Sequence, residues 1–317
     1  MTVATKVGMN VAMKVGILGS GFGLYGYLPA LAALQSRVLL PERYRTVVAS
    51  RAELSGFTAG IDWVADEHAA IDGAEALVIA RRPADQSGLI AKILRQNGLK
   101  RLLLEKPLAQ TPALAAQLQN QIEASGKILR MGYMFGFTGW GRDLVARATE
   151  STGDLQIKWT FRAHHYAANL SNWKRSGTEG GGALRFYGIQ LISLLADVGF
   201  DGVLASSTIS AISDEAEVWC ATLSNSKGAR CEIEVDSNSA QPEFSIRAPA
   251  LSLATSLSDP FGEPSNAVQD RRVPILSSLC RELLTSEQTP HSSYRKTIAL
   301  WQAIEDVTVH RSGGRAG

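Results

Sequence analysis

Residues 13–26 have the sequence MKVGILGSGFGLYG. The apolar run at 14–18 predicts a buried strand, and residues 24–34 predict a helix. A strand, a glycine turn and a helix form the first half of a dinucleotide-binding βαβ unit, in which the N-terminus of the helix faces the phosphates. We therefore expect a dinucleotide to contact the turn, at Gly19, Ser20, Gly21, Phe22 and Gly23.

The third glycine departs from the usual G-x-G-x-x-G spacing, because position 24 is Leu24 and the glycine is Gly23. A tight turn that binds no ligand is the alternative interpretation of such a motif. The position of the turn between a strand and a helix favours binding.

The bulk composition is that of a globular protein with ordinary charge. The chain has 317 residues, enough for two domains, and a net charge of +2. This small charge argues against nucleic acid or an anionic membrane as a partner, and no apolar run is long enough to span a bilayer. Three cysteines without metal-binding spacing, Cys220, Cys231 and Cys280, predict reduced thiols, no metal site and a cytoplasmic location. Residues 1–12 lack a signal-peptide core and are expected to be a loose extension, with Met13 as an alternative start.

Two different patterns of elements follow one another along the chain. Strands alternate with helices up to residue 134, which predicts a parallel, doubly wound Rossmann sheet. Its expected strands are 14–18, 44–51, 74–80, 100–107 and 127–133, with helices at 85–97 and from Thr111-Pro112 onward. Later strands alternate with polar turns and predict an α+β domain with a mostly antiparallel, open-faced sheet. Its expected elements are strands at 155–165, 203–210, 215–223, 228–236 and 242–248, and helices at 183–198, 274–285 and 292–308.

These patterns divide the chain into a dinucleotide-binding domain at 13–134 and a substrate and oligomerisation domain at 135–285. Residues 286–317 are expected to form a C-terminal helix that packs back on the domains, followed by a tail.

The expected second strand predicts the choice of cofactor. In a dinucleotide-binding fold, an acid at the tip of this strand binds the ribose 2′-OH of NAD. The predicted tip here is Ser50-Arg51, which suits the 2′-phosphate of NADP, although a solvated surface arginine is the alternative. We expect NADP(H) to be preferred and NAD(H) to be possible. Ala80 ends the next strand and Arg81 follows it, and both are expected to lie near the nicotinamide half.

The run Glu105-Lys106-Pro107, together with the glycine turn and Gly180-Gly181-Gly182, resembles the Gfo/Idh/MocA family of NAD(P)-dependent sugar and inositol oxidoreductases. The resemblance covers nearly the whole chain. It implies that Lys106 lies between nicotinamide and substrate and binds the reacting oxygen, where a cation stabilises a developing alkoxide. Glu105 and Pro107 are expected beside the cofactor.

The resemblance fails at three positions of the helix after the glycines. The family usually has Asp, His and Asp where this sequence has Phe186, Gln190 and Ser193. Gln190 cannot exchange a proton near neutral pH, so another group must supply it or catalysis has been lost. Tyr187, with a pKa lowered by a neighbouring lysine, is our first candidate and His165 our second. A packed tyrosine and a structural histidine are the alternatives.

Several residues are candidates for substrate contacts. An aromatic ring beside cations suits a sugar that carries phosphate or carboxylate, although a surface loop is the alternative. The candidates are Tyr133, Trp173, Lys174, Arg185 and Gln190.

The sequence therefore favours an NADP(H)-dependent oxidoreductase that acts on a carbonyl or carbinol of a sugar-like substrate, with nucleotide-linked and acidic sugars included. The alternatives are a family member that binds the cofactor as a regulator or partner subunit, and one that uses it without net redox change. We also expect a homodimer or homotetramer, because the open sheet face, with Trp219 and residues 231–235, needs a cover.

Overall fold

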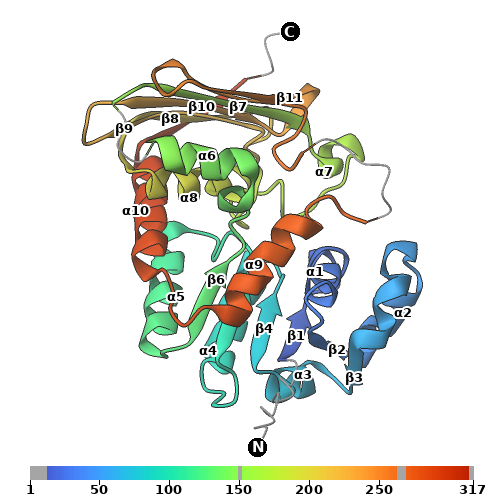
Figure 1. The fold of residues 1–317 in the computed structure, drawn as a ribbon. Helices are drawn as coiled ribbons and strands as arrows, with labels where there is room; N and C mark the ends of the chain where they lie inside the picture. Colours follow the sequence, from blue (N-terminus) through green and yellow to red (C-terminus); the bar gives the residue numbers. More distant parts are fainter. Residues whose placement is uncertain (1–12, 149–151, 263–268, 314–317) are drawn as a thin grey trace, which may run out of the picture.

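The computed structural model describes residues 13–148, 152–262 and 269–313. A parallel sheet with helices on both faces forms the lower half of the molecule in Figure 1, and a broad second sheet forms the top. The extension expected at 1–12 lies outside the described residues.

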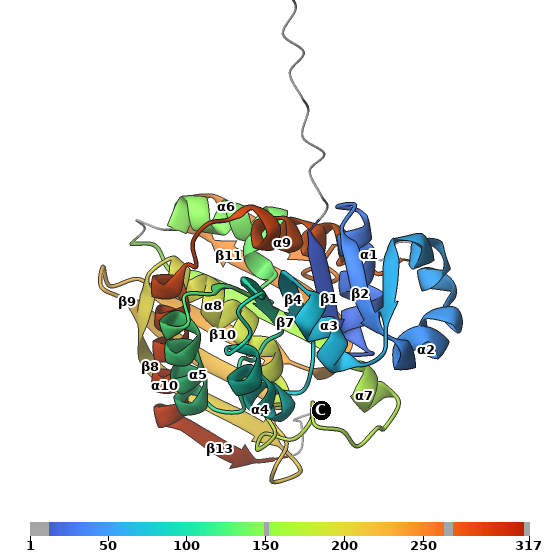
Figure 2. The ribbon, with the colours of Figure 1, turned by 90° about the horizontal axis from the view of Figure 1, so that it is seen from below.

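The lower sheet has six parallel strands in the order β3-β2-β1-β4-β5-β6. Its neighbouring strands β2, β1 and β4 are labelled in the view from below (Figure 2). Its central strands are buried along almost their whole length, as expected for a parallel sheet covered on both faces. The predicted doubly wound Rossmann sheet is confirmed. The strands are β1 (Lys14–Leu18), β2 (Arg37–Pro41), β3 (Ile61–Val64), β4 (Ala76–Ile79), β5 (Arg101–Leu104) and β6 (Ile128–Met131).

Helices cover both faces of this sheet. Thr111 caps α5, because its hydroxyl oxygen accepts a hydrogen bond from the Leu114 amide at 3.3 Å. Helix α9 comes from late in the chain and packs against α1, β5 and β6. The helical segments are η1 (Gly23–Tyr27), α1 (Leu28–Ala32), η2 (Glu42–Tyr44), α2 (Arg45–Ala49), η3 (Ala52–Gly60), α3 (Glu67–Gly73), α4 (Pro83–Ile93), α5 (Pro112–Ala124) and α9 (Val273–Thr285).

The prediction of a strand at 44–51 is wrong. The second strand is β2, which precedes this segment, and residues 42–49 are helical. The physical reason is burial: residues 38–41 are buried beside β1, whereas in α2 only Val48 is buried. Strand β3 was not predicted.

The upper sheet has seven strands in the order β12-β11-β7-β10-β9-β8-β13. The β7–β10 and β8–β13 pairs are parallel and the other four pairs are antiparallel, which confirms a mostly antiparallel sheet in an α+β domain. Strands β12 and β13 were not predicted. The strands are β7 (Leu155–Arg162), β8 (Phe200–Ser210), β9 (Val218–Asn225), β10 (Arg230–Asp236), β11 (Asn238–Ala248), β12 (Leu253–Leu257) and β13 (Thr308–Ser312).

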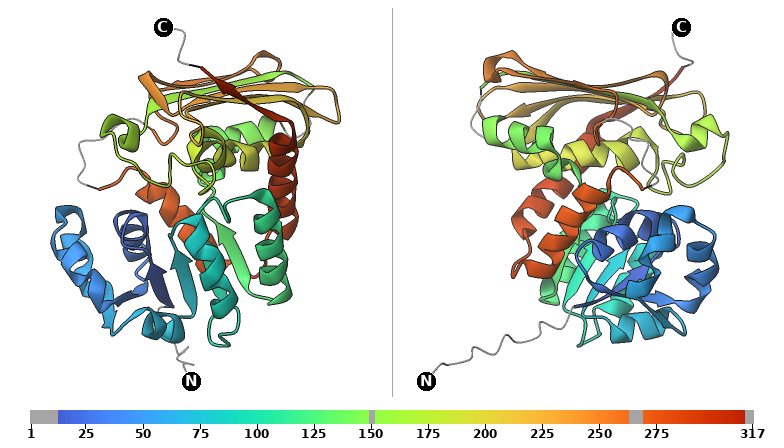
Figure 3. Two further views of the ribbon diagram at one scale, coloured as in Figure 1. Left: turned by 180° about the vertical axis from the view of Figure 1, so that it is seen from behind. Right: turned by 45° about the vertical axis from the view of Figure 1, so that its right-hand side comes forward.

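Helices cover the lower face of this sheet, and the upper face carries none in Figures 1 and 3. Helix α10 packs against α8 and β8 of the second domain and against α5 of the Rossmann domain, so it contacts both domains. The helical segments of this part are η4 (Phe135–Phe137), α6 (Gly139–Ala148), α7 (His164–Ala167), η5 (Ala183–Gly188), α8 (Ile189–Asp197), η6 (Pro249–Leu251) and α10 (His291–Val307). Within the described ranges no helix is long and apolar enough to cross a membrane.

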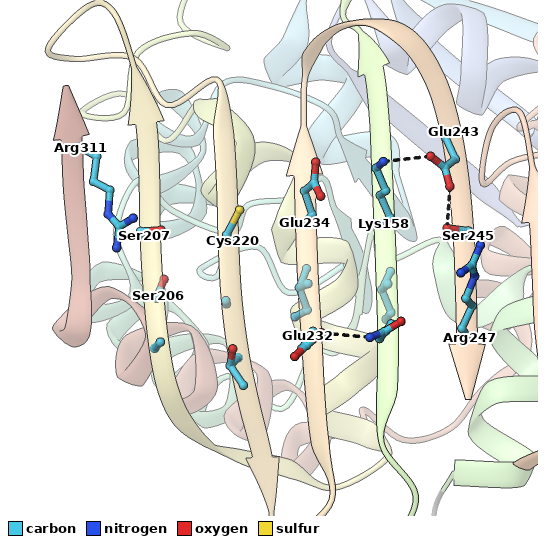
Figure 4. A pocket seen from close by; sticks show the side chains of 16 residues that line it. Lys158, Ser206, Ser207, Cys220, Glu232, Glu234, Glu243, Ser245, Arg247 and Arg311 are labelled. Atoms are coloured by element: carbon cyan, nitrogen blue, oxygen red, sulfur yellow. Dashed lines mark hydrogen bonds and ion pairs between the residues drawn. The ribbon is translucent and has the colours of Figure 1, made fainter. Parts of the chain in front are cut away.

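The expectation that Trp219 lies on the open sheet face is wrong. Trp219 is fully buried, and a Cβ added to Gly188 would approach its ring to 2.6 Å, so the ring faces η5. Its neighbour Cys220 points outward, together with Glu232 and Glu234 of β10 (Figure 4). Because side chains alternate along a strand, the apolar residues of these strands pack against the helices and the polar residues face outward.

Candidate active site

A cavity of about 1220 Å³ lies between the two domains. Three parts of the chain line it: the Rossmann sheet with its glycine turn, the segment from β7 to α8, and residues between 259 and 272. The predicted site residues on its wall are Gly19, Ser20, Gly21, Phe22, Ala80, Arg81, Glu105, Lys106, Trp173, Lys174, Tyr187 and Gln190. The structure therefore places the glycine turn and Lys106 of the Glu-Lys-Pro segment on the wall of the same cavity.

The glycine turn has the geometry of a phosphate-binding turn. Gly19 has φ +135°, and a Cβ there would lie 2.3 Å from the Ala80 carbonyl oxygen, so this position requires glycine. A Cβ at Gly21 would meet no protein atom within 4 Å. Among the described residues, the backbone amides of Ser20, Gly21 and Phe22 have no hydrogen-bond partner. Free amides beside open space fit the pyrophosphate of a dinucleotide.

A second group of side chains surrounds Glu67, near the end of β2. The Gly19 amide donates to Tyr44 Oη at 3.0 Å, and the Tyr44 hydroxyl donates to Glu67 at 3.1 Å. Arg43 and Arg81 both form ion pairs with the same Glu67 carboxylate. Arg43, Tyr44 and Arg81 line the cavity, so two guanidinium groups lie where the fold places the adenosine ribose.

Ser50 and Arg51 are not at this position, and neither lines the cavity. The Ser50 hydroxyl donates to the Val47 carbonyl oxygen, and Arg51 pairs with Glu53 at 3.2 Å. They were predicted to lie at the tip of the second strand because that strand was expected at residues 44–51, too late in the chain. The true strand ends at Pro41, and Arg43 follows it closely.

Buried contacts hold the Glu-Lys-Pro segment in place after β5. Gln86 of α4 donates to the carbonyl oxygens of Glu105 and Pro107, at 3.0 and 3.1 Å. The Glu105 carboxylate accepts from the Tyr27 hydroxyl at 2.5 Å, and burial raises the pKa of Glu105. Pro107 does not line the cavity, so its role is in the turn.

The Lys106 ammonium group points across the cavity toward η5. Lys106 Nζ donates to the Phe186 carbonyl oxygen at 2.6 Å and lies 3.5 Å from the centroid of the Phe186 ring. The side chain is only 9% exposed. Burial lowers the pKa of Lys106 to about 7, against the opposing attraction of Glu105. A lysine with this pKa exchanges a proton near neutral pH.

The two candidate proton donors, Tyr187 and His165, differ from expectation. Burial raises the pKa of Tyr187, so the predicted lowering by a lysine is wrong, although Tyr187 does line the cavity. His165 is buried behind it, with ring centroids 6.3 Å apart, and does not line the cavity; the adjacent His164 does. Burial lowers the pKa of His165 to about 4, which leaves it neutral. Residues 164–167 form a helical turn instead of ending the strand.

Gln190 bridges two parts of the fold. Its side-chain oxygen accepts from the Met134 amide at 2.8 Å, and its nitrogen donates to the Gly132 carbonyl oxygen at 3.1 Å. Both amide atoms are thus bonded to the loop after β6, and this explains physically why an amide stands at this position.

Two predicted substrate contacts are not in the cavity. Arg185 pairs with Glu305 of α10 through two bonds of 2.6 and 2.5 Å, so it links helices. Tyr133 packs edge-on against Tyr294 of α10, with centroids 6.1 Å apart. Neither residue lines the cavity wall.

The third wall of the cavity comes from late in the chain and was not predicted from the sequence. Arg272 precedes α9, and its guanidinium carbon lies 4.4 Å from the ring centroid of Phe22 in the glycine turn. Asp270 pairs with Arg272 at 2.7 Å. No sequence motif marks this contact, because it joins residues about 250 positions apart.

No protein-family model and no curated protein matches the chain. Solved structures do match its fold over almost the whole length. GenD2 from gentamicin A biosynthesis, in complex with NAD, is 17% identical, with a TM-score of 0.70 over 96% of this chain and 95% of that one. KijD10, a 3-ketoreductase from Actinomadura kijaniata in complex with NADP and TDP-benzene, is 16% identical, with a TM-score of 0.68 over 95% and 99%.

A third structure, levoglucosan dehydrogenase in complex with NADH and levoglucosan, is 12% identical, with a TM-score of 0.69 over 93% of this chain and 96% of that one. These structures share the two-domain fold of this chain. At such identities they establish the fold, and the chemistry has to be argued from the site itself.

Proposed function

We propose that this chain is an NADP(H)-dependent oxidoreductase that interconverts a carbonyl and a carbinol on a sugar-like substrate. The observation that carries the proposal is the position of Lys106, whose ammonium group lies in the same cavity as the glycine turn. Similar structures bind NAD or NADP, and levoglucosan dehydrogenase was solved with a sugar derivative, which supports the same chemistry here.

The nicotinamide, when bound, supplies or accepts the hydride. Lys106 binds the reacting oxygen and, in the reducing direction, gives it a proton as the carbonyl becomes a hydroxyl. Glu105 remains buried beside it and favours the charged ammonium. Tyr187 keeps its phenolic proton, because its pKa is raised, and donates a hydrogen bond without acting as a base.

The cofactor preference for NADP(H) rests on the wall around Glu67. Arg43, Arg81 and Arg82 line this end of the cavity. The acid that follows β2, Glu42, pairs with the exposed Arg45 and is not on the cavity wall. Two arginines that share one carboxylate keep a net positive charge, which suits a 2′-phosphate.

A cofactor-binding regulator is the second candidate, because the Lys106 ammonium is bonded to Phe186 and Gln190 is bonded to backbone. NADPH oxidation with a panel of keto-sugars separates the two. For an enzyme, we expect Lys106→Ala to lower turnover about a hundredfold or more with little change in NADPH affinity, because the contact acts in the transition state.

Tyr187→Phe should lower turnover about tenfold, the value of one hydrogen bond. The matched control is Lys92→Ala, because Lys92 is an exposed lysine of α4. NADPH binding with no oxidation of any sugar by the parent protein would favour the regulator.

A further inference from the structure

The ammonium group of Lys174 lies on the cavity wall without a carboxylate partner. Among the described residues, Lys174 Nζ takes part in no hydrogen bond or ion pair, and it lies over the Phe186 ring, 5.3 Å from the centroid. Two other cations of the wall are paired with carboxylates: Arg271 with Asp259 and Arg272 with Asp270. Lys174 is half-buried, and a half-buried unpaired charge is costly.

The backbone around Lys174 is fixed on both sides. Its amide donates to Asn172 Oδ1 at 2.9 Å, and its carbonyl oxygen accepts from the Gly182 amide at 2.8 Å. The Gly181 amide donates to the Ser176 carbonyl oxygen at 2.8 Å and closes the loop. A side chain on a backbone held in this way is positioned before any ligand arrives.

The surroundings of Lys174 are positively charged. Lys106 Nζ contacts the same Phe186 ring, and the pKa of Lys174 is lowered first by burial and then by Arg272, against the opposing charge of Glu105. Over the whole cavity wall, eight side chains are Lys or Arg and four are Asp or Glu. The nearby Glu105 carboxylate is already bonded to the Tyr27 hydroxyl. The inner part of the cavity therefore attracts a further negative charge.

We propose that Lys174 binds an anionic group of the substrate, so that the substrate is a sugar that carries a carboxylate or a phosphate. This inference rests on the proposed function, since it takes the reacting carbon to lie at Lys106. Trp173 packs edge-on against Phe186, with centroids 5.1 Å apart, and provides an apolar wall for the sugar ring next to the charge. Arg175 takes no part, because it pairs with Glu215 at 2.8 Å.

The test is a titration of the NADP⁺-saturated full chain with three probes: inorganic phosphate, acetate and glucose. Lysine NMR signals report the contact, and calorimetry gives the affinity. We expect one of the anions, but not glucose, to shift the single lysine signal that is missing from Lys174→Met. The affinity of the protein for that anion should fall about tenfold or more in Lys174→Met and stay unchanged in Lys92→Met. The tighter anion distinguishes a sugar phosphate from a sugar acid.

The inference is overturned if neither anion moves the Lys174 signal, or if Lys174→Met binds the anions as well as the parent does. NADPH binding, followed by its own fluorescence, is measured separately, and the anion titration is repeated without cofactor. If NADPH binds normally but Lys174→Met and the parent bind the anions equally, the anionic substrate is rejected and the proposed oxidoreductase function is not. Failure to bind NADPH rejects the proposed function, while the Lys174 titration still decides the inference.

Discussion

Lys106 is the side chain whose protonation would govern hydride transfer in this cavity. Its pKa of about 7 follows from burial, so the ammonium form is lost as the pH rises through neutrality. If Lys106 donates the proton in reduction, kcat for reduction should fall above about pH 7, and kcat for oxidation should rise over the same interval. A pH profile of kcat in both directions measures this.

Tyr187→Phe should leave the midpoint of that profile in place, because the Tyr187 phenol does not ionise near neutral pH. A profile that is flat between about pH 6 and 8 for the parent protein would exclude Lys106 as the acid. His165 cannot produce the midpoint, since its pKa lies at about 4.

The choice of cofactor is also decided by single residues. We predict that Arg43→Ala weakens NADPH binding by about 1.5–3 kcal/mol and leaves NADH binding nearly unchanged, because only NADPH carries the 2′-phosphate. Arg45→Ala is the matched control, since Arg45 pairs with Glu42 and neither residue lines the cavity. Calorimetry with both cofactors measures the difference. Equal affinity of the parent for NADPH and NADH would contradict the prediction.

At the level of elements, two glycines of one turn should respond differently to the same substitution. Gly19→Ala places a Cβ against the Ala80 carbonyl oxygen and at φ +135°, so we expect a loss of about 2 kcal/mol or more in the free energy of unfolding. Gly21→Ala points into open space, so stability should be unchanged while cofactor affinity falls, because the methyl group takes the place of the phosphates.

Urea unfolding and NADPH titration of both variants test this pair. If Gly21→Ala binds NADPH as well as the parent does, the turn is not the pyrophosphate site. If Gly19→Ala is as stable as the parent, the close approach of β1 and β4 at this turn is looser than the structure has it.

On the scale of the whole molecule, the outward face of the upper sheet carries charged residues of both signs, which could pair across an interface between two copies of the chain. A hollow of about 580 Å³ on this face is lined by both charge signs, with Lys158 paired to Glu243 at 3.1 Å and Arg311 on the far strand (Figure 4). We predict a homodimer or homotetramer formed through this face. Because the contacts would be largely between charges, high salt should weaken it.

Light scattering at micromolar concentration, in low and high salt, measures the mass. Glu234→Lys, at the centre of this face, should lower the fraction of oligomer, and Lys92→Glu on α4 should leave it unchanged. A monomer in low salt would contradict the prediction.

The sequence by itself determined the fold class of the Rossmann domain, four of its six strands and the places of two motifs. Apolar periodicity and glycine turns are local signals, so β1, β4, β5 and β6 were found close to their true positions. The Glu-Lys-Pro segment was placed correctly because it directly follows a buried strand, and strand ends meet at the ligand side of such a sheet.

Tertiary structure alone decided the rest of the site. Whether residues 38–41 or 44–51 form the second strand depends on which run is buried beside β1, and both runs are apolar enough to be strands. The pKa of Lys106, the bonds that occupy Gln190 and the approach of Arg272 to Phe22 all arise between segments far apart in the chain. Burial and charge pairing are properties of the packed molecule, and no local pattern of residues encodes them.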